Sequence, residues 1–190
     1  MLKDLIKKCR SYRRFDENKA IGREELIELI DLARLSSSAA NRQPLKYYLS
    51  YAQDSNNNIF GTLAWAGYLK DWDGPAQGER PTGYIVILGD KNIAESFNID
   101  PGIAAQSIML GAVERGMGGC IIASVDREEL RTLLTIPAQY EILYVLAIGY
   151  PVEKVEIEEV GPDGDIKYWR DSDGVHHVPK RKISEIIISP

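Results

Sequence analysis

Residues 100–123 read DPGIAAQSIMLGAVERGMGGCIIA and predict a helix that leads directly into a strand. Asp100 followed by Pro101 is a strong helix start, because Asp is a good N-cap and Pro suits the first helical position. Small side chains along this helix would let another helix or a second subunit approach closely. The glycine-rich segment 116–119 ends the helix, so it is not a phosphate-binding loop, which would precede one.

Helices and strands alternate on both sides of this stretch. Amphipathic spacing predicts helices at about 2–9, 23–35 and 59–69, and Asp126 with Glu129 predicts a capped helix that runs to Leu134. Apolar runs predict strands at about 46–51, 84–88, 120–123 and 141–148. The pattern indicates an α+β or α/β layered domain with a sheet covered by helices.

The composition limits the class of protein. The chain has 190 residues, 44% of them hydrophobic and 27% charged, with a formal net charge of −5, which predicts one globular domain over 1–190 with an excursion at about 54–81. An acidic chain is a poor candidate for nucleic-acid binding. A charged N-terminus without a signal peptide, and an apolar run at 142–148 too short to span a bilayer, predict a cytoplasmic protein without membrane contacts. Its two cysteines predict reduced, buried thiols.

The sequence lacks the usual protein-borne catalysts. The only histidines, His176 and His177, are adjacent in a turn-rich tail, where successive side chains diverge. A metal site or a catalytic dyad is therefore not expected there. No Ser-His-Asp or Cys-His arrangement stands out, so we expect any reaction to be carried by a bound cofactor.

Positive charge gathers in two places on this acidic chain. The first is Arg10-Ser11-Tyr12-Arg13-Arg14-Phe15, and the second is Lys180-Arg181-Lys182. Converging on one phosphate, the two patches would form an anion site. The alternative is that these side chains are simply solvated.

Two further segments suit a flat heterocycle. The loop 38–44 has small residues, and the carboxamides of Asn41 and Gln43 can both donate and accept at a ring edge. The segment 120–124 could place backbone N–H groups beside the same ring. A phosphate at one end and a planar, hydrogen-bonding heterocycle at the other describe flavin mononucleotide (FMN).

These segments resemble the FMN-dependent nitroreductase family. The resemblance rests on five motifs in order, Arg10 to Phe15, Ser37-Ser38-Ala39-Ala40-Asn41-Arg42-Gln43-Pro44, Gly102-Ile103-Ala104-Ala105-Gln106, Gly116-Met117-Gly118-Gly119-Cys120 and Ala147-Ile148-Gly149-Tyr150-Pro151. Each motif alone is weak, but five in order are specific. The excursion at 54–81 is the least typical part, and Cys9, Ser37 and Leu45 stand where the family often has arginine, proline and tryptophan.

The resemblance implies an α+β fold, a three-layer α/β/α sandwich around a mostly antiparallel sheet. It also implies a homodimer with FMN at the interface and a C-terminal arm exchanged between protomers. The apolar run 183–188 would then be a strand that pairs with the partner's sheet. The implied enzyme takes electrons from NADH or NADPH and passes them by a ping-pong mechanism to small acceptors, such as nitroaromatic or quinone-like compounds.

A scaffold that binds no cofactor stays open at this point, and so do two alternatives that keep the flavin. One is a flavin-binding module with little turnover, acting in sensing or storage. The other is a reductive dehalogenase or enoate-type reductase built on the same scaffold, which fold and flavin site alone would not separate from a nitroreductase.

The resemblance also assigns cofactor-binding residues. The residues expected to hold the FMN phosphate and ribityl chain are Arg10, Ser11, Arg13, Lys180 and Lys182. The residues expected to approach the same flavin from the partner subunit are Ser37, Ser38, Asn41 and Gln43. Ala123 and Ser124 would lie by the flavin ring, where a backbone N–H can assist hydride transfer. No residue is required as an acid or a base.

Aromatic side chains mark the excursion. Trp65, Tyr68 and Trp72 could line a substrate site as part of a lid over the flavin. Equally, they could pack the excursion against the domain.

Overall fold

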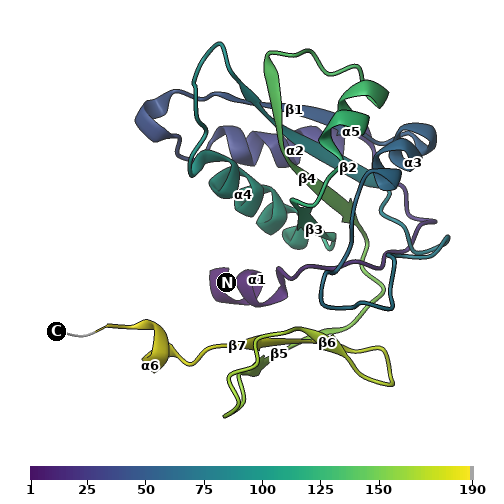
Figure 1. Ribbon diagram of the computed structural model, residues 1–190, viewed down its shortest axis with the longest axis vertical. Coiled ribbons are helices and arrows are strands. Elements are labelled where there is room, and N and C mark those ends of the chain that lie inside the picture. The colour runs from purple at the N-terminus through teal and green to yellow at the C-terminus, as the bar shows by residue number, and fades with distance from the viewer. Residues whose placement is uncertain (189–190) are drawn as a thin grey trace.

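A four-stranded antiparallel sheet forms the centre of the computed structural model, which describes residues 1–188 (Figure 1). Its strands lie in the order β1-β2-β4-β3. Their bounds are β1 Leu45–Ser50, β2 Gly83–Asp90, β3 Gly118–Ile122 and β4 Tyr140–Gly149. The four predicted strands are therefore confirmed, each within about three residues at either end.

Helices cover both faces of this sheet. On one face α2 (Arg23–Arg34) and α4 (Asp100–Glu114) pack against Ile85 and Ile87 of β2. On the other face α3 (Gln53–Gly61) and α5 (Arg127–Leu133) pack against Tyr84, Val86 and Leu88. Alternate residues of β2 thus face opposite layers, which explains why the whole strand is buried. The predicted α+β fold, with three layers and an antiparallel sheet, is confirmed.

The N-terminal segment brings the arginine cluster to the edge of the sheet. Helix α1 (Leu2–Lys8) lies beside α4, and the chain then passes β3, where Ser11 forms a bridge with Gly119. Only glycine fits at position 119, because a Cβ there would collide with the carbonyl oxygen of Ala147. Phe15 forms the next bridge, with Pro151, and its side chain is fully buried. These contacts fix the path of residues 10–14.

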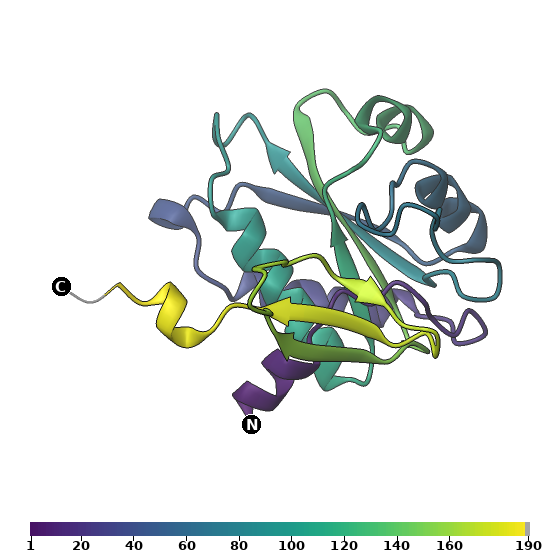
Figure 2. The same ribbon diagram turned by 60° about the horizontal axis from the view of Figure 1, so that its bottom comes forward.

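A second, smaller sheet follows β4, where the sequence had predicted only a polar tail with turns. It consists of β5 (Val155–Glu159), β6 (Trp169–Arg170) and β7 (His176–Lys180). β7 lies in the middle, parallel to β5 and antiparallel to β6. Figure 2 shows this sheet in front of the main body, with α1 beside it. Asp163-Gly164 and Asp173-Gly174, dipeptides typical of turns, do form turns here, and the two glycines have φ angles of 74° and 78°.

Three expectations from the sequence are wrong. The helix predicted at 59–69 lies earlier, as α3, because the chain turns after Gly61 and Leu63 bridges to Val125. The strand predicted at 183–188 begins as a short helix, α6 (Ile183–Ile186), since no strand of the described chain pairs with it. Asp100 is not the N-cap of α4 but its first residue, and its carboxylate binds another loop.

No helix within residues 1–188 is both long and apolar enough to cross a membrane. The capping prediction for α5 is confirmed, because the Asp126 carboxylate accepts a hydrogen bond of 3.0 Å from the backbone N–H of Glu129.

Candidate functional site

The arginine cluster lines a cavity that we call the Arg13 cavity. Arg10, Ser11 and Arg13 reach it from the N-terminal segment, and Lys180 reaches it from the end of β7. The cavity has a volume of about 350 Å³, and its other walls are Cys9, Gln106, Met109, Gly119, Ile121, Tyr168, His176 and Val178. Four of the residues assigned to a phosphate site thus lie around one space.

The charge of this cavity is entirely basic. Arg10, Arg13 and Lys180 line it, and no acidic side chain does so within the part of the chain that the structure describes. The Nη2 atom of Arg10 donates to the carbonyl of Ile6 at 2.8 Å, but its buried Nε has no partner among residues 1–188. A buried donor without an acceptor is rare in proteins. The cavity therefore suits an anion.

Arg13 is held by contacts that leave its charge uncompensated. Only 7% of the residue is exposed. Its Nη1 donates to the carbonyl of Ser11 at 3.1 Å and lies 3.2 Å from Nε2 of His176. The guanidinium also lies over the ring of Tyr168, 4.8 Å from its centroid. None of these partners is a carboxylate.

His176 supports Arg13 as a neutral base. Burial and the nearby charges of Arg13 and Arg170 lower the pKa of His176 to about 4. Because the Arg13 guanidinium can only donate, Nε2 of the neutral ring is the nitrogen without a proton and accepts the hydrogen bond. The proton resides on Nδ1, which is buried and has no partner among residues 1–188.

A buried carboxylate fixes the backbone behind these groups. Glu153 accepts the backbone N–H of Arg13 through Oε1, and through the same oxygen that of Arg14 at 3.2 Å. Its other oxygen, Oε2, pairs with Arg170 of β6 at 3.1 Å. Glu153 thereby ties the arginine cluster to the second sheet.

The sequence reasoning did not assign roles to Glu153, Tyr168 or His176. One signal was available for His176, because His176, Val178 and Lys180 alternate along a strand and share a face. All three line the Arg13 cavity. No comparable pattern marks Glu153 or Tyr168.

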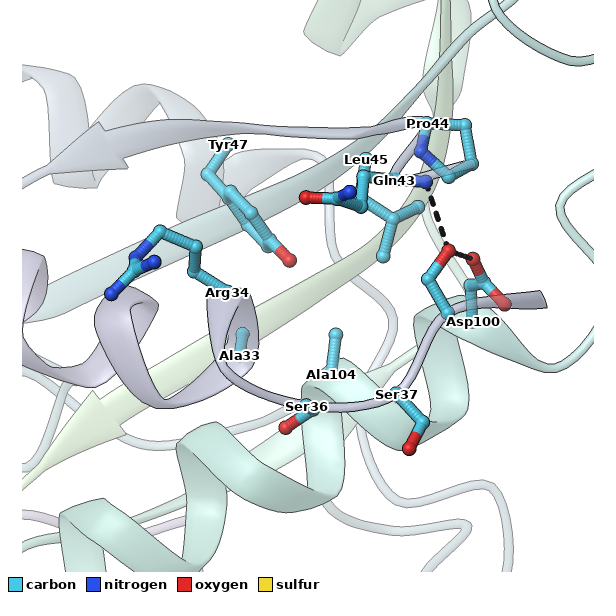
Figure 3. A pocket seen from close by; sticks show the side chains of 11 residues that line it. Ala33, Arg34, Ser36, Ser37, Gln43, Pro44, Leu45, Tyr47, Asp100 and Ala104 are labelled. Atoms are coloured by element: carbon cyan, nitrogen blue, oxygen red, sulfur yellow. Dashed lines mark hydrogen bonds between the residues drawn. The ribbon is translucent and has the colours of Figure 1, made fainter. Parts of the chain in front are cut away.

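The loop after α2 lies at a different pocket, shown in Figure 3. Ser37, Ser38 and Gln43 line it together with Asp100 and Ala104 from the first turns of α4, and its volume is about 170 Å³. No residue lines both this pocket and the Arg13 cavity. Within one chain, the structure therefore does not bring these loop residues to the arginine cluster.

Asp100 holds this loop in shape. Its carboxylate accepts the hydroxyl of Ser38 at 2.5 Å and the backbone N–H of Ala39 at 2.9 Å, and it is buried. The Ser38 oxygen in turn accepts the backbone N–H of Gln43 at 2.9 Å. Burial and the charge of Asp100 raise the pKa of the neighbouring Tyr47 to about 12, so its hydroxyl stays protonated.

The loop itself is strained. Ala40, Asn41 and Gln43 have φ angles of 51°, 53° and 51°, in the left-handed region that side chains disfavour. The exposed carboxamide of Gln43 donates to the carbonyl and the Oδ1 of Asn41, both at 3.2 Å. Such strain is typical of functional loops whose shape is set by their surroundings.

Four of the assigned cofactor-binding residues line neither space: Asn41, Ala123, Ser124 and Lys182. Ala123 and Ser124 are exposed just after β3, and their amide N–H groups have no acceptor among residues 1–188. They follow Ile121, which lines the Arg13 cavity. Lys182 does not line this cavity and pairs with Glu159, with 3.9 Å between the charged atoms.

The aromatic side chains of the excursion divide into two groups. Trp65 is only 9% exposed and packs in the core on the side of the sheet that α3 covers, so it is a packing residue. Tyr68 is half-exposed, and its ring lies 4.9 Å from that of Tyr168, a wall of the Arg13 cavity. Trp72 packs under the guanidinium of Arg170 at 4.9 Å. Through Tyr68, the excursion therefore contacts a wall of the Arg13 cavity.

The cysteines are free thiols, as predicted. Cys120 is buried, whereas Cys9 is only half-buried and lines the Arg13 cavity. Burial raises the pKa of both thiols, so neither is an activated nucleophile. Residues 1–188 contain no group of three or more His, Cys, Asp or Glu side chains that could hold a metal ion.

Comparison with known proteins identifies the family. The sequence profile described as "Nitroreductase family" matches residues 6–150. The chain belongs to the nitroreductase family. The resemblance noted from the five motifs is thereby confirmed. The matched part of this nitroreductase family member ends before the second sheet, which supplies Tyr168, His176 and Lys180 to the Arg13 cavity.

Relatives of this nitroreductase family member support the assignment. YodC of Bacillus subtilis is 24% identical over 196 residues, covering 87% of this chain and 97% of YodC. A nitroreductase family protein from Streptococcus pneumoniae superposes with a TM-score of 0.73 at 17% identity, covering 100% of both chains. The NADPH:FMN oxidoreductase of Vibrio harveyi, solved with NAD+, has a TM-score of 0.65 at 20% identity, covering 85% of this chain and 74% of its own. These solved structures share the fold.

Proposed function

We propose that this protein is an FMN-dependent oxidoreductase that takes electrons from NADH or NADPH. The observation that carries the proposal is the Arg13 cavity, where three cations and no acidic side chain line one space in the described part of an acidic chain. The family and the named activity of the Vibrio harveyi enzyme support it.

The residues of the Arg13 cavity fit the phosphate end of FMN. Arg13 and Lys180 provide charge, and the unpartnered Nε of Arg10 provides a buried donor. Charge-assisted hydrogen bonds from guanidinium groups are the strongest that side chains offer to a phosphate. Ser11 lines the same space and adds a hydroxyl.

When bound, FMN supplies the redox chemistry that these side chains lack. The exposed amide N–H groups of Ala123 and Ser124 are suited to donate to a flavin ring that extends from the cavity along the end of β3. Tyr68, and Trp72 beneath Arg170, would offer an aromatic wall to a flat acceptor. The acceptors that we propose are small nitroaromatic or quinone-like compounds, reduced by a ping-pong mechanism.

The proposed enzyme is a homodimer. Ser37, Ser38, Asn41 and Gln43 would approach the FMN of a second copy, which explains why one chain keeps them away from its own arginine cluster. The C-terminal segment projects from the main body in both ribbon views (Figures 1 and 2). Its isoleucines are exposed, with Ile183 at 71% and Ile188 at 95%. An arm exchanged with the partner would bury them.

Anaerobic mixing with NADH or NADPH tests this function. The purified protein, saturated with FMN, is mixed with either nucleotide in a stopped-flow cell while the visible flavin absorbance is followed. We expect the oxidised flavin band to bleach, and to return when a quinone is added. A protein that fails to bind FMN, or a bound flavin that stays oxidised with both nucleotides, would contradict the proposal.

A further inference from the structure

A second polar cavity lies on the opposite side of the sheet from α4. It has a volume of about 220 Å³ and lies between the first turn of α3, the start of β2 and the segment 17–20. We call it the Tyr84 cavity. In Figure 1, α3 is at the upper right, far from the second sheet that forms a wall of the Arg13 cavity. The two cavities share no lining residue.

Tyr84 presents a buried hydroxyl to this cavity. The residue is 0% exposed, and burial raises its pKa well above the usual range for a phenol. The hydroxyl therefore stays protonated and remains a donor.

Arg80 brings a buried, unpartnered donor to the same cavity. Its guanidinium lies over the ring of Phe60, 4.2 Å from the centroid, and both residues line the cavity. Stacking occupies the face of the guanidinium and leaves the N–H groups in its plane unused. Its Nε is buried without a partner, and Arg80 forms no ion pair among the residues described. The cavity thus holds one buried donor that lacks an acceptor, Nε of Arg80, together with the protonated hydroxyl of Tyr84.

The single acidic residue at the cavity does not satisfy these donors. Oε2 of Glu17 accepts the backbone N–H groups of Gly78 and Arg80. The neighbouring Glu79 carboxylate binds Arg14, with Oε2 accepting Nε at 2.7 Å. The nearby carboxylates therefore fix the segment 78–80 and leave the guanidinium of Arg80 directed toward the cavity.

The remaining walls indicate the kind of acceptor that fits. Phe60 and Pro81 give flat apolar surface, and Gln53 and Asn57 give amide groups at the mouth. A cavity of this size is small for a nucleotide, since sites for larger ligands occupy roughly 300–1,000 Å³. We infer that the Tyr84 cavity is a binding site for a small carboxylate with a flat apolar body, whose charge lies on Arg80 and the Tyr84 hydroxyl.

An NMR titration with benzoate tests this inference. FMN-saturated protein is titrated while the backbone amide signals of Gln53 and Thr82, at the Tyr84 cavity, and of Gly119, at the Arg13 cavity, are followed separately. We expect saturable shifts at Gln53 and Thr82. The readout is local and needs no turnover, so it stands or fails independently of the proposed oxidoreductase function.

Matched variants identify the groups that bind. Tyr84→Phe removes only the hydroxyl, and Arg80→Gln removes the charge. We expect benzoate affinity at Gln53 and Thr82 to fall about threefold to tenfold in Tyr84→Phe and at least about tenfold in Arg80→Gln. Arg23→Gln, at an exposed arginine in α2, should leave it unchanged. Neutral benzamide should bind wild-type protein at least about tenfold more weakly than benzoate.

Three results would overturn the inference. They are the absence of saturable shifts at Gln53 and Thr82, equal affinity for benzoate in wild type and in folded Arg80→Gln and Tyr84→Phe, and equal affinity of wild type for benzoate and benzamide. The amide spectrum of each variant shows directly whether it is folded.

Discussion

Arg13 and His176 are 163 positions apart in the chain, yet Nη1 of Arg13 lies 3.2 Å from Nε2 of His176. This contact joins the N-terminal segment to the second sheet, and it requires His176 to be neutral, since a protonated ring would meet Arg13 with a second positive charge. Burial is the largest cause of the lowered pKa of His176, and the charge of Arg13 adds to it.

This contact predicts a pH dependence of stability. The pKa of His176 is about 4 in the folded protein and near 6.5 for an ordinary histidine. As pH falls from 6.5 to 4, the unfolded chain gains a proton that the folded chain does not. The free energy of unfolding should then decrease by at most about 3 kcal/mol.

Urea denaturation at several pH values measures this effect, and His176→Gln should remove its share of the decrease. His177 changes the free energy of unfolding in the opposite direction. Hydrogen bonding to Asp171 raises the pKa of His177, so the stability that this contact contributes is lost as pH rises above 6.5. A His176→Gln variant with the full wild-type slope between pH 4 and 6.5 would refute the assignment.

The Ser38 hydroxyl predicts a local contribution to stability. Ser38→Ala removes the donor to Asp100 and the acceptor for the Gln43 N–H. We expect a loss of about 1–3 kcal/mol in the free energy of unfolding, because the Asp100 carboxylate stays buried with fewer partners. Ser37→Ala, at an exposed neighbour, should change it by less than about 0.5 kcal/mol. Equal effects of the two variants would disprove the role of Ser38.

Helices α2 and α4 pack closely at Gly111, and this close contact can be tested by substitution. A Cβ at this position would collide with the side chain of Leu32, and would lie 3.2 Å from that of Leu29. Gly111→Ala should therefore lower stability by about 1–3 kcal/mol despite its better helix propensity. Gly102→Ala in the same helix has open space and should be neutral or stabilising by up to about 1 kcal/mol. Thermal unfolding compares them, and a Gly111→Ala protein as stable as Gly102→Ala would rule out this close contact.

The main sheet and its helices could be predicted from the sequence because burial imposes a period. The strand at 84–88 and the helix at 23–35 repeat their apolar residues at strand and helix spacing, and the structure has β2 and α2 there. The second sheet could not be found in this way. Its strands are partly exposed and carry charged residues, so their composition resembles that of a loop.

The candidate site was predicted in its parts but not in its arrangement. Arg10, Arg13 and Lys180 were grouped by charge, and the structure places them around one cavity. Asp100 was read as a helix cap because Asp before Pro favours that role. Its carboxylate instead binds Ser38, a contact 62 positions away in sequence that no local pattern encodes.

The exposed isoleucines of the C-terminal segment predict a role in assembly. Ile187 is 59% exposed, and Ile187→Asp should weaken dimerisation at least about tenfold if a second copy covers it. Ile166→Asp, at a similarly exposed isoleucine before the second sheet's β6, should not. Sedimentation equilibrium measures both. A monomeric wild type, or an unaffected Ile187→Asp dimer, would contradict the exchanged arm.

The affinity of the protein for FMN compared with riboflavin tests the central claim most directly, because the two ligands differ only in the phosphate. We expect wild type to bind FMN at least about tenfold more tightly than riboflavin, and Arg13→Ala to lose most of this difference, since charge-assisted hydrogen bonds contribute about 1.5–3 kcal/mol. Arg14→Ala, whose side chain pairs with Glu79 instead, is the matched control and should keep it. Fluorescence titration of apoprotein gives all six constants, and an FMN preference that persists unchanged in Arg13→Ala would contradict the proposed phosphate site.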